Sequence, residues 1–115
     1  ESDVLADVIK ELYRLKYLDD ARLASRLVEE AKTKTFIGRR LLEEKMEKLS
    51  LPQASVEAAL AQYDPSNEPK VARLSLKSKK KLGSPQSAAS FLVRKGFEEE
   101  VVESVVTELF DLEYS

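Results

Sequence analysis

Apolar residues recur along the whole chain at the spacing that defines one face of an α-helix. No stretch sustains the alternation of apolar and polar residues that is typical of a β-strand. The glycines and prolines fall mostly between the periodic stretches, where they are typical of helix ends. The sequence therefore predicts an all-α fold of about seven helices, whose apolar faces lie within residues 4–15, 23–31, 41–49, 56–63, 71–82, 88–92 and 101–110.

The first long helical stretch is expected to break near Tyr17 and Leu18. Asp19 and Asp20 follow, and carboxylates in this place can accept backbone N–H bonds and favour the positive end of a helix dipole. We therefore expect one helix to end before residue 19 and a second helix to begin there.

The second half of the chain repeats the layout of the first half. Adding 46 to a position pairs Met46 with Leu92 and Val56 with Val102, and no gap is needed between these pairs. A shift of 48 pairs Ala24 with Ala72. A three-helix unit of this length buries little apolar surface alone and gains by stacking on a neighbour. Chance similarity remains the alternative, because any two amphipathic helices align some apolar positions.

Composition excludes several chemistries. The 115 residues include no Cys and no His, which removes thiol nucleophiles, disulfides, Cys/His zinc sites and histidine general bases. The longest apolar runs are far shorter than the roughly 20 residues that cross a bilayer. We therefore expect a cytoplasmic non-enzyme that is a monomer, with no catalytic residues, no cofactor, no small-molecule substrate and no membrane partner.

Carboxylate pairs do not change this expectation. Adjacent residues on a helix point about 100° apart, so Asp19-Asp20, Glu43-Glu44 and residues 98–100 do not converge on one point. Carboxylates at helix starts also have a simpler role beside the helix dipole. No metal site is expected.

The charged residues are strongly segregated along the chain. Residues 69–97 carry eight basic side chains and no acidic one, whereas residues 98–115 carry seven acidic side chains and no basic one. On a helix, Lys70, Arg73, Lys77 and Lys81 would share one face. This face is either solvated and compensated by the acidic helix, or it binds an anionic partner. Aromatic residues do not interleave the lysines, which favours a phosphate backbone or an acidic protein over stacked bases.

A second basic candidate is Gly38-Arg39-Arg40, where two guanidinium groups follow a glycine at a helix start. Positive charge there opposes the helix dipole, which hints at a contact elsewhere, although such a pair is also common on a solvated surface. The candidate partner-binding residues are Arg39, Arg40, Lys70, Arg73, Lys77, Lys79, Lys80, Lys81, Arg94 and Lys95.

Four short motifs follow one another along the chain: Tyr17-Leu18-Asp19-Asp20, then Leu23-Ala24, then Gly38-Arg39-Arg40, and finally Arg94-Lys95-Gly96-Phe97. Together they resemble the RecX family of RecA regulators over nearly the whole chain. The resemblance implies tandem three-helix repeats in an elongated, curved array. It also implies the division into residues 1–16 as the last helix of a truncated first repeat, 17–64 as the second repeat and 65–115 as the third. Because the chain starts at Glu1 and enters a helix at once, we expect it to be a piece of a longer protein.

The resemblance implies a protein that binds the RecA filament on DNA and damps the ATPase, strand-exchange and co-protease activities of RecA in recombination, repair and the SOS response. Two departures stand out. Leu49-Ser50-Leu51 replaces the Lys-Gly-hydrophobic turn that family members commonly carry, so the turn geometry there is expected to differ. The acidic pI of about 5.3 argues against direct DNA contact but not against contact with RecA. The alternative is a DNA-binding module that lays the helix around residues 77–81 against phosphates.

Overall fold

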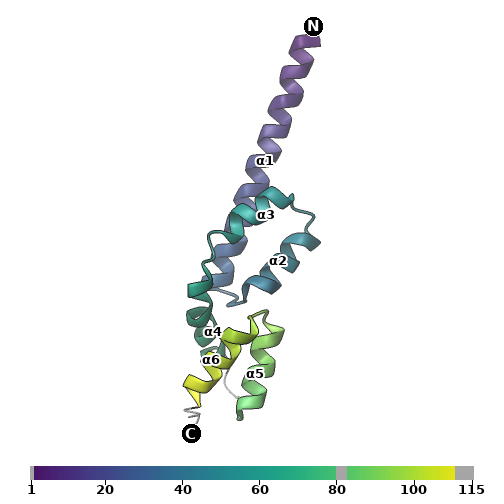
Figure 1. The fold of residues 1–115 in the computed structure, drawn as a ribbon. Helices are drawn as coiled ribbons and strands as arrows, with labels where there is room; N and C mark the ends of the chain where they lie inside the picture. The colour runs from purple at the N-terminus through teal and green to yellow at the C-terminus, as the bar shows by residue number, and fades with distance from the viewer. Residues whose placement is uncertain (1, 80–82, 111–115) are drawn as a thin grey trace.

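The computed structural model describes residues 2–79 and 83–110, and within them the chain is helical with no strand (Figure 1). The prediction of an all-α fold is confirmed. In chain order the elements are α1 (Ser2–Thr33), α2 (Arg39–Lys48), α3 (Gln53–Leu60), the 3-10 helix η1 (Pro65–Asn67), α4 (Glu68–Lys77), α5 (Pro85–Arg94) and α6 (Glu99–Leu109).

The predicted break at residues 17–18 is wrong, because α1 runs without interruption from Ser2 to Thr33. No glycine or proline stands in this stretch, so nothing removes a backbone hydrogen bond or favours a turn. Asp19 is accommodated inside the helix, exposed and 4.0 Å from the guanidinium of Arg22 one turn later. The described residues therefore contain six α-helices, where seven were expected.

Two three-helix units follow one another along the molecule. In the first, which we call the middle unit, the second half of α1 packs against α2 and α3; in the other, the last unit, α4 packs against α5 and α6. Corresponding positions are buried in both units, as for Met46 and Leu92, which are fully buried. The core of both units consists of Ala24, Val28, Ala31, Ile37, Leu42, Met46, Val56, Ala59, Tyr63, Val71, Ala72, Leu76, Ala88, Leu92, Phe97, Val102, Val105 and Val106.

The first half of α1 projects beyond the middle unit as an arm (Figure 1). The molecule measures 75 × 25 × 18 Å, and its radius of gyration of 19.0 Å exceeds the roughly 13 Å of a compact chain of this length. No described helix covers the apolar side of the arm, where large side chains are between 44% and 71% exposed. These side chains are Val4, Leu5, Val8, Ile9, Leu12, Tyr13, Leu15 and Tyr17.

The turns that end α2 and α5 have the same geometry, although one contains serine and the other glycine. Ser50 has φ +57° and Gly96 has φ +89°, both in the left-handed region. In each turn the next N–H reaches back to the helix, from Leu51 to Met46 and from Phe97 to Leu92, at 3.2 Å. This is the Schellman closure of a helix C-terminus. The expectation that the turn at residue 50 differs is therefore wrong for its backbone.

We expect Ser50→Gly to raise the free energy of unfolding by about 1 kcal/mol, because glycine adopts a left-handed conformation without the steric cost that a Cβ adds. Ser50 is exposed and its side chain lies outside the core, so little else changes. Urea denaturation followed by circular dichroism measures the difference. A destabilised variant would contradict the expectation.

Candidate partner-binding surface

The basic residues of the last unit do not form one continuous row. Helix α4 ends at Lys77, with Ser78 as its C-cap, so the predicted helix over residues 71–82 is too long. Lys80 and Lys81, which complete the predicted basic face, lie outside the described residues.

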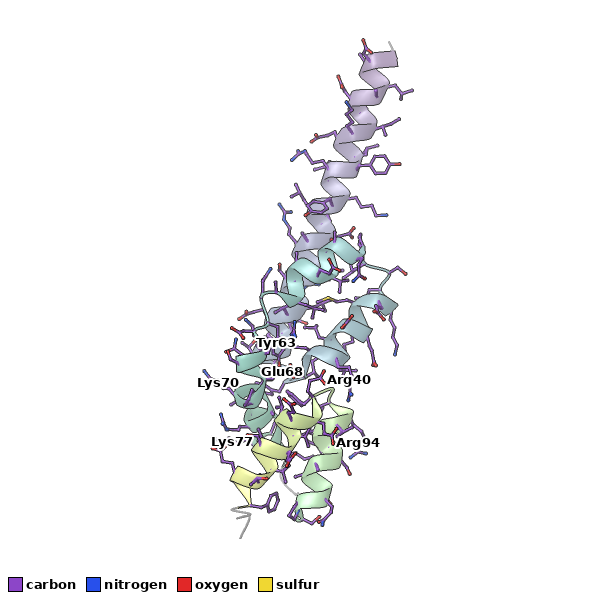
Figure 2. All side chains as sticks on the ribbon, in the orientation of Figure 1. Arg40, Tyr63, Glu68, Lys70, Lys77 and Arg94 are labelled. Carbon is purple, nitrogen blue, oxygen red and sulfur yellow. The ribbon has the colours of Figure 1, made fainter. Side chains whose placement is uncertain are left out.

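Figure 2 shows Lys70 and Lys77 on the side of the last unit formed by α4, and Arg94 on the opposite side, on α5. All three side chains are exposed. None of them makes an ion pair within the described part of the chain. The structure therefore offers Lys70 and Lys77 together as one cationic pair on α4, and it places Arg94 apart from them.

Two other candidates on this unit are engaged within the molecule. The Arg73 Nε donates to the Glu108 carboxylate at 3.0 Å, which joins α4 to the acidic helix α6. The ammonium of Lys79 lies over the ring of Phe91, 4.6 Å from its centre. Of the two alternatives left open for the basic face, compensation by the acidic helix therefore applies to Arg73. An exposed pair of this kind contributes at most about 1 kcal/mol, so its main effect is to neutralise Arg73.

The remaining candidates, Arg39, Arg40 and Lys95, lie where the middle and last units meet. The Arg40 Nη2 donates to the carbonyl of Val93 at 3.3 Å, and the Lys95 Nζ donates to the carbonyl of Thr35 at 2.8 Å. The side chains of Arg40 and Lys95 therefore join one unit to the other, whereas the Arg39 Nη2 donates to the carbonyl of Leu60 within the middle unit at 3.3 Å. Burial, and after it the charge of Lys45, lowers the pKa of Lys95. Contacts within the molecule account for these residues, which sequence reasoning had assigned to a partner.

Backbone atoms approach closely at the same junction. The Gly38 N–H donates to the Lys95 carbonyl at 2.8 Å. A Cβ added at Gly38 would lie 2.3 Å from the carbonyl oxygen of Gly96, and one added at Gly96 would lie 2.3 Å from the Cβ of Leu41. Only glycine fits at either position, because the two units meet backbone to backbone. The motifs Gly38-Arg39-Arg40 and Lys95-Gly96-Phe97 thus face each other across the junction.

A buried polar cluster lies beneath this contact. Glu68 is 2% exposed and lies near Arg39 and Glu98, which belong to different units, and one of its carboxylate oxygens, Oε2, is buried without a hydrogen-bond partner. Tyr63 is fully buried and its hydroxyl donates to the carbonyl of Ile37 at 2.9 Å. Burial raises the pKa of Tyr63 and is also the largest influence on Glu68, whose pKa rises despite the nearby Arg39. Sequence reasoning missed this cluster, since an acidic residue before Pro69 is typical of an ordinary helix start.

We expect the pH dependence of stability to change in Glu68→Gln. The pKa of Glu68 is higher in the folded chain than its ordinary value of 4.5, so the folded state binds this proton more tightly than the unfolded state does. Stability contributed by this group is therefore lost as pH rises from about 4.5 through the folded pKa, and glutamine removes that loss.

Thermal melts of both proteins between pH 4 and pH 7 test this, read as the difference between them so that other carboxylates cancel. The native protein should lose stability relative to Glu68→Gln as the pH rises. If the stability of the two proteins changed with pH in parallel, the raised pKa assigned to Glu68 would be contradicted.

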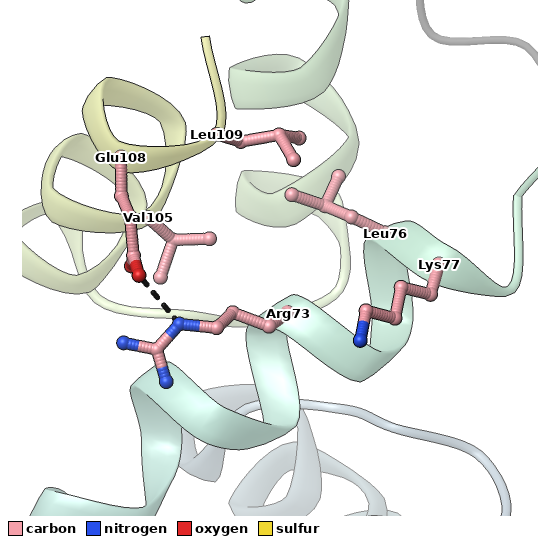
Figure 3. A pocket seen from close by; sticks show the side chains of 6 residues that line it. All are labelled: Arg73, Leu76, Lys77, Val105, Glu108 and Leu109. Carbon is pink, nitrogen blue, oxygen red and sulfur yellow. Dashed lines mark hydrogen bonds and ion pairs between the residues drawn. The ribbon is translucent and has the colours of Figure 1, made fainter. Parts of the chain in front are cut away.

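The last unit also has an open hollow between α4 and α6, with a volume of about 330 Å³ (Figure 3). Leu76, Val105 and Leu109 form its apolar surface, and Arg73, Lys77 and Glu108 surround it. No pattern in the sequence indicated this hollow. Leu109 carries the helical spacing of a core residue but is 57% exposed.

No helix among residues 2–79 and 83–110 has the length and apolar character needed to cross a membrane. The same residues bring together no group of three acidic side chains that could hold a metal ion.

Comparisons with known proteins find relatives that share one name. No protein-family model matches the chain. Regulatory protein RecX of Geobacillus thermodenitrificans (strain NG80-2) is 33% identical over 113 residues, and RecX of Geobacillus kaustophilus (strain HTA426) is 30% identical over 112 residues. Each match covers 91% of this chain but only 42% of the relative, so the chain spans about two fifths of the length of these proteins.

The arrangement of helices also matches a solved structure. The crystal structure of RecX from Lactobacillus salivarius superposes with a TM-score of 0.70, covering 97% of this chain and 77% of that one at 16% identity. At this identity the likeness establishes the arrangement of helices, whereas the Geobacillus proteins supply the likeness in sequence. From both, the chain belongs to the RecX family.

Proposed function

We propose that the protein regulates RecA recombinase by binding along the RecA filament on DNA and inhibiting its ATPase, strand-exchange and co-protease activities. Membership of a family of regulatory proteins supports a regulatory role. The observation that carries the proposal is the elongated shape: two helical units in series and the arm of α1 beyond them extend over 75 Å, and stacked helical units build extended binding surfaces. Such a surface suits a partner that is itself a repeating array.

The contact surface proposed for the filament is the α4 side of the last unit. Lys70 and Lys77 are exposed there and have no ion-pair partner among the described residues, so their charge is available to an acidic protein surface. Arg40 and Lys95 are already used in joining the units, and Arg39 donates to the carbonyl of Leu60 within the middle unit, so none of the three is part of this proposed surface.

The division of the chain into residues 1–16, 17–64 and 65–115 is proposed with the function. The packing of α4, α5 and α6 around one core, like that of α2 and α3 around the second half of α1, supports units of this size. On this division the apolar arm of α1 belongs to a further unit that would cover it.

RecA's DNA-dependent ATPase rate, measured with increasing amounts of the protein at two salt concentrations, tests the proposal. Inhibition at substoichiometric amounts is expected, because one elongated molecule contacts a filament rather than a single protomer. The double variant Lys70→Glu/Lys77→Glu should require at least tenfold more protein for the same inhibition. The matched control Lys34→Glu/Lys48→Glu changes the charge equally on exposed residues of the middle unit and should inhibit normally.

Absence of inhibition by the unmodified protein would overturn the proposed function, and normal inhibition by Lys70→Glu/Lys77→Glu would remove α4 from it.

The alternative, a DNA-binding module, is favoured by the acid-free stretch over residues 69–97. Direct binding to phosphates needs no RecA and weakens steeply with salt. Tight duplex binding by the isolated protein with a steep salt dependence would favour that alternative.

A further inference from the structure

The hollow of the last unit has a counterpart in the middle unit. The shifts of 48 and 46 residues place Ser25 where Arg73 stands and Gln62 where Glu108 stands. Both pairs bridge the corresponding helices: the Gln62 Nε2 donates to the Ser25 hydroxyl at 3.2 Å, and the Arg73 Nε donates to Glu108 at 3.0 Å. The two units can therefore be compared position by position at this place.

The counterpart is filled. Val28 and Ala59 are at most 2% exposed, and the corresponding Leu76 and Val105 are only 5% and 1% exposed, so the units differ at the next pair instead. Tyr63 corresponds to Leu109 and is completely buried, whereas Leu109 is 57% exposed. The two units differ in where these helices end. Helix α3 ends at Leu60, whereas α6 continues past the equivalent residue, Val106, to Leu109.

The chain that closes the middle unit shows what chemistry this place accepts. It supplies one bulky aromatic side chain, Tyr63, followed by the acidic residues Asp64 and Glu68. Glu68 is buried at the junction, near the first residue of α2, Arg39, and so near the positive end of that helix. An apolar anchor flanked by carboxylates therefore covers the end of the middle unit.

The hollow of the last unit is suited to the same combination. Its surface is apolar at Leu76, Val105 and Leu109, and its edge carries two cations and one carboxylate. Because Glu108 is paired with Arg73, the ammonium of Lys77 is the lining charge that has no ion-pair partner among the described residues. Lys70, two turns earlier on α4, adds a second exposed cation.

We infer that this hollow binds an acidic segment of the protein partner that inserts one bulky apolar side chain between α4 and α6, with its carboxylates against Lys77 and Lys70. The inference takes the existence of a protein partner from the proposed function. It takes the chemistry of the segment from the hollow itself and from its filled counterpart.

Titration of the isotope-labelled chain with the peptide Asp-Glu-Tyr-Asp-Glu tests the inference by nuclear magnetic resonance. The methyl signals of Leu76, Val105 and Leu109 should shift, and binding should weaken as salt rises. Replacing the tyrosine of the peptide by alanine, or its four acids by lysine, should weaken binding at least tenfold. Absence of shifts at these methyls, or equal binding of the lysine peptide, would overturn the inference.

Two matched variants locate the binding. Leu109→Glu alters an exposed leucine of the hollow, and Leu49→Glu alters a similarly exposed leucine, 54% accessible, at the end of α2. Both should keep the helical signal in circular dichroism. Binding should fall at least tenfold in the first variant and stay unchanged in the second; equal loss in both would contradict the site.

The same two variants in the RecA ATPase assay keep the inference and the proposed function distinguishable. Peptide binding to the hollow without any inhibition of RecA would leave the hollow as a site and overturn the RecA role. Inhibition that survives in Leu109→Glu, together with no peptide binding to the unmodified chain, would overturn the hollow and leave the RecA role standing.

Discussion

Gly96→Ala is expected to lower the free energy of unfolding by about 2 to 5 kcal/mol. Two costs add up. The φ of +89° is strained for any residue with a Cβ, and the added Cβ would lie 2.3 Å from the Cβ of Leu41 and 2.5 Å from its backbone nitrogen. Backbone cannot move aside as the end of a flexible side chain can, so the contact between the two units must open.

Urea denaturation gives the loss of stability, and hydrogen exchange gives its location. The Gly38 N–H, which donates to the Lys95 carbonyl across the junction, should lose protection more than amides in the interior of α5. Gly83→Ala is the control, since no described atom lies within 4 Å of a Cβ built there. A Gly96→Ala protein as stable as Gly83→Ala would show that the close approach does not hold the units together.

The sequence was sufficient for the helical class because the apolar spacing is set by the helix itself. Of the eighteen core residues, sixteen occupy positions that the spacing already marked as apolar faces, and only Ile37 and Phe97 do not. The break at residues 17–18 was predicted wrongly because acidic residues favour helix starts but are also tolerated inside a helix when they stay exposed. Without a glycine or proline, the local preference of acidic residues for helix starts was too weak to end the helix.

The roles of the basic residues were harder to predict. Arg40 and Lys95 are 55 positions apart in the sequence, and both bind carbonyls of the opposite unit. Sequence reasoning treats an exposed cation as available to a partner, because it does not show which carbonyl lies within reach once the units stack. The same limit applies to Gly38 and Gly96, whose turns were recognised but whose mutual contact depends on how two distant segments meet.

Leu92→Ala is expected to lower the free energy of unfolding by about 2 to 5 kcal/mol, because it leaves a cavity in the core of the last unit. Leu92 is fully buried, at the position that corresponds to Met46 in the middle unit. The core around it is formed by α4, α5 and α6, which are short helices of 10 or 11 residues. Helices of this length depend on packing for their stability, so the whole unit should weaken.

Leu12→Ala is the matched control on the arm of α1, where the leucine is 61% exposed and contacts no core. It removes the same atoms from the same kind of helix and should change stability by less than about 0.5 kcal/mol. Urea denaturation of the two variants therefore separates burial from helix propensity. A loss at Leu12 as large as that at Leu92 would mean that the arm is covered in solution, and that the apolar side of α1 stabilises the protein through a contact of its own.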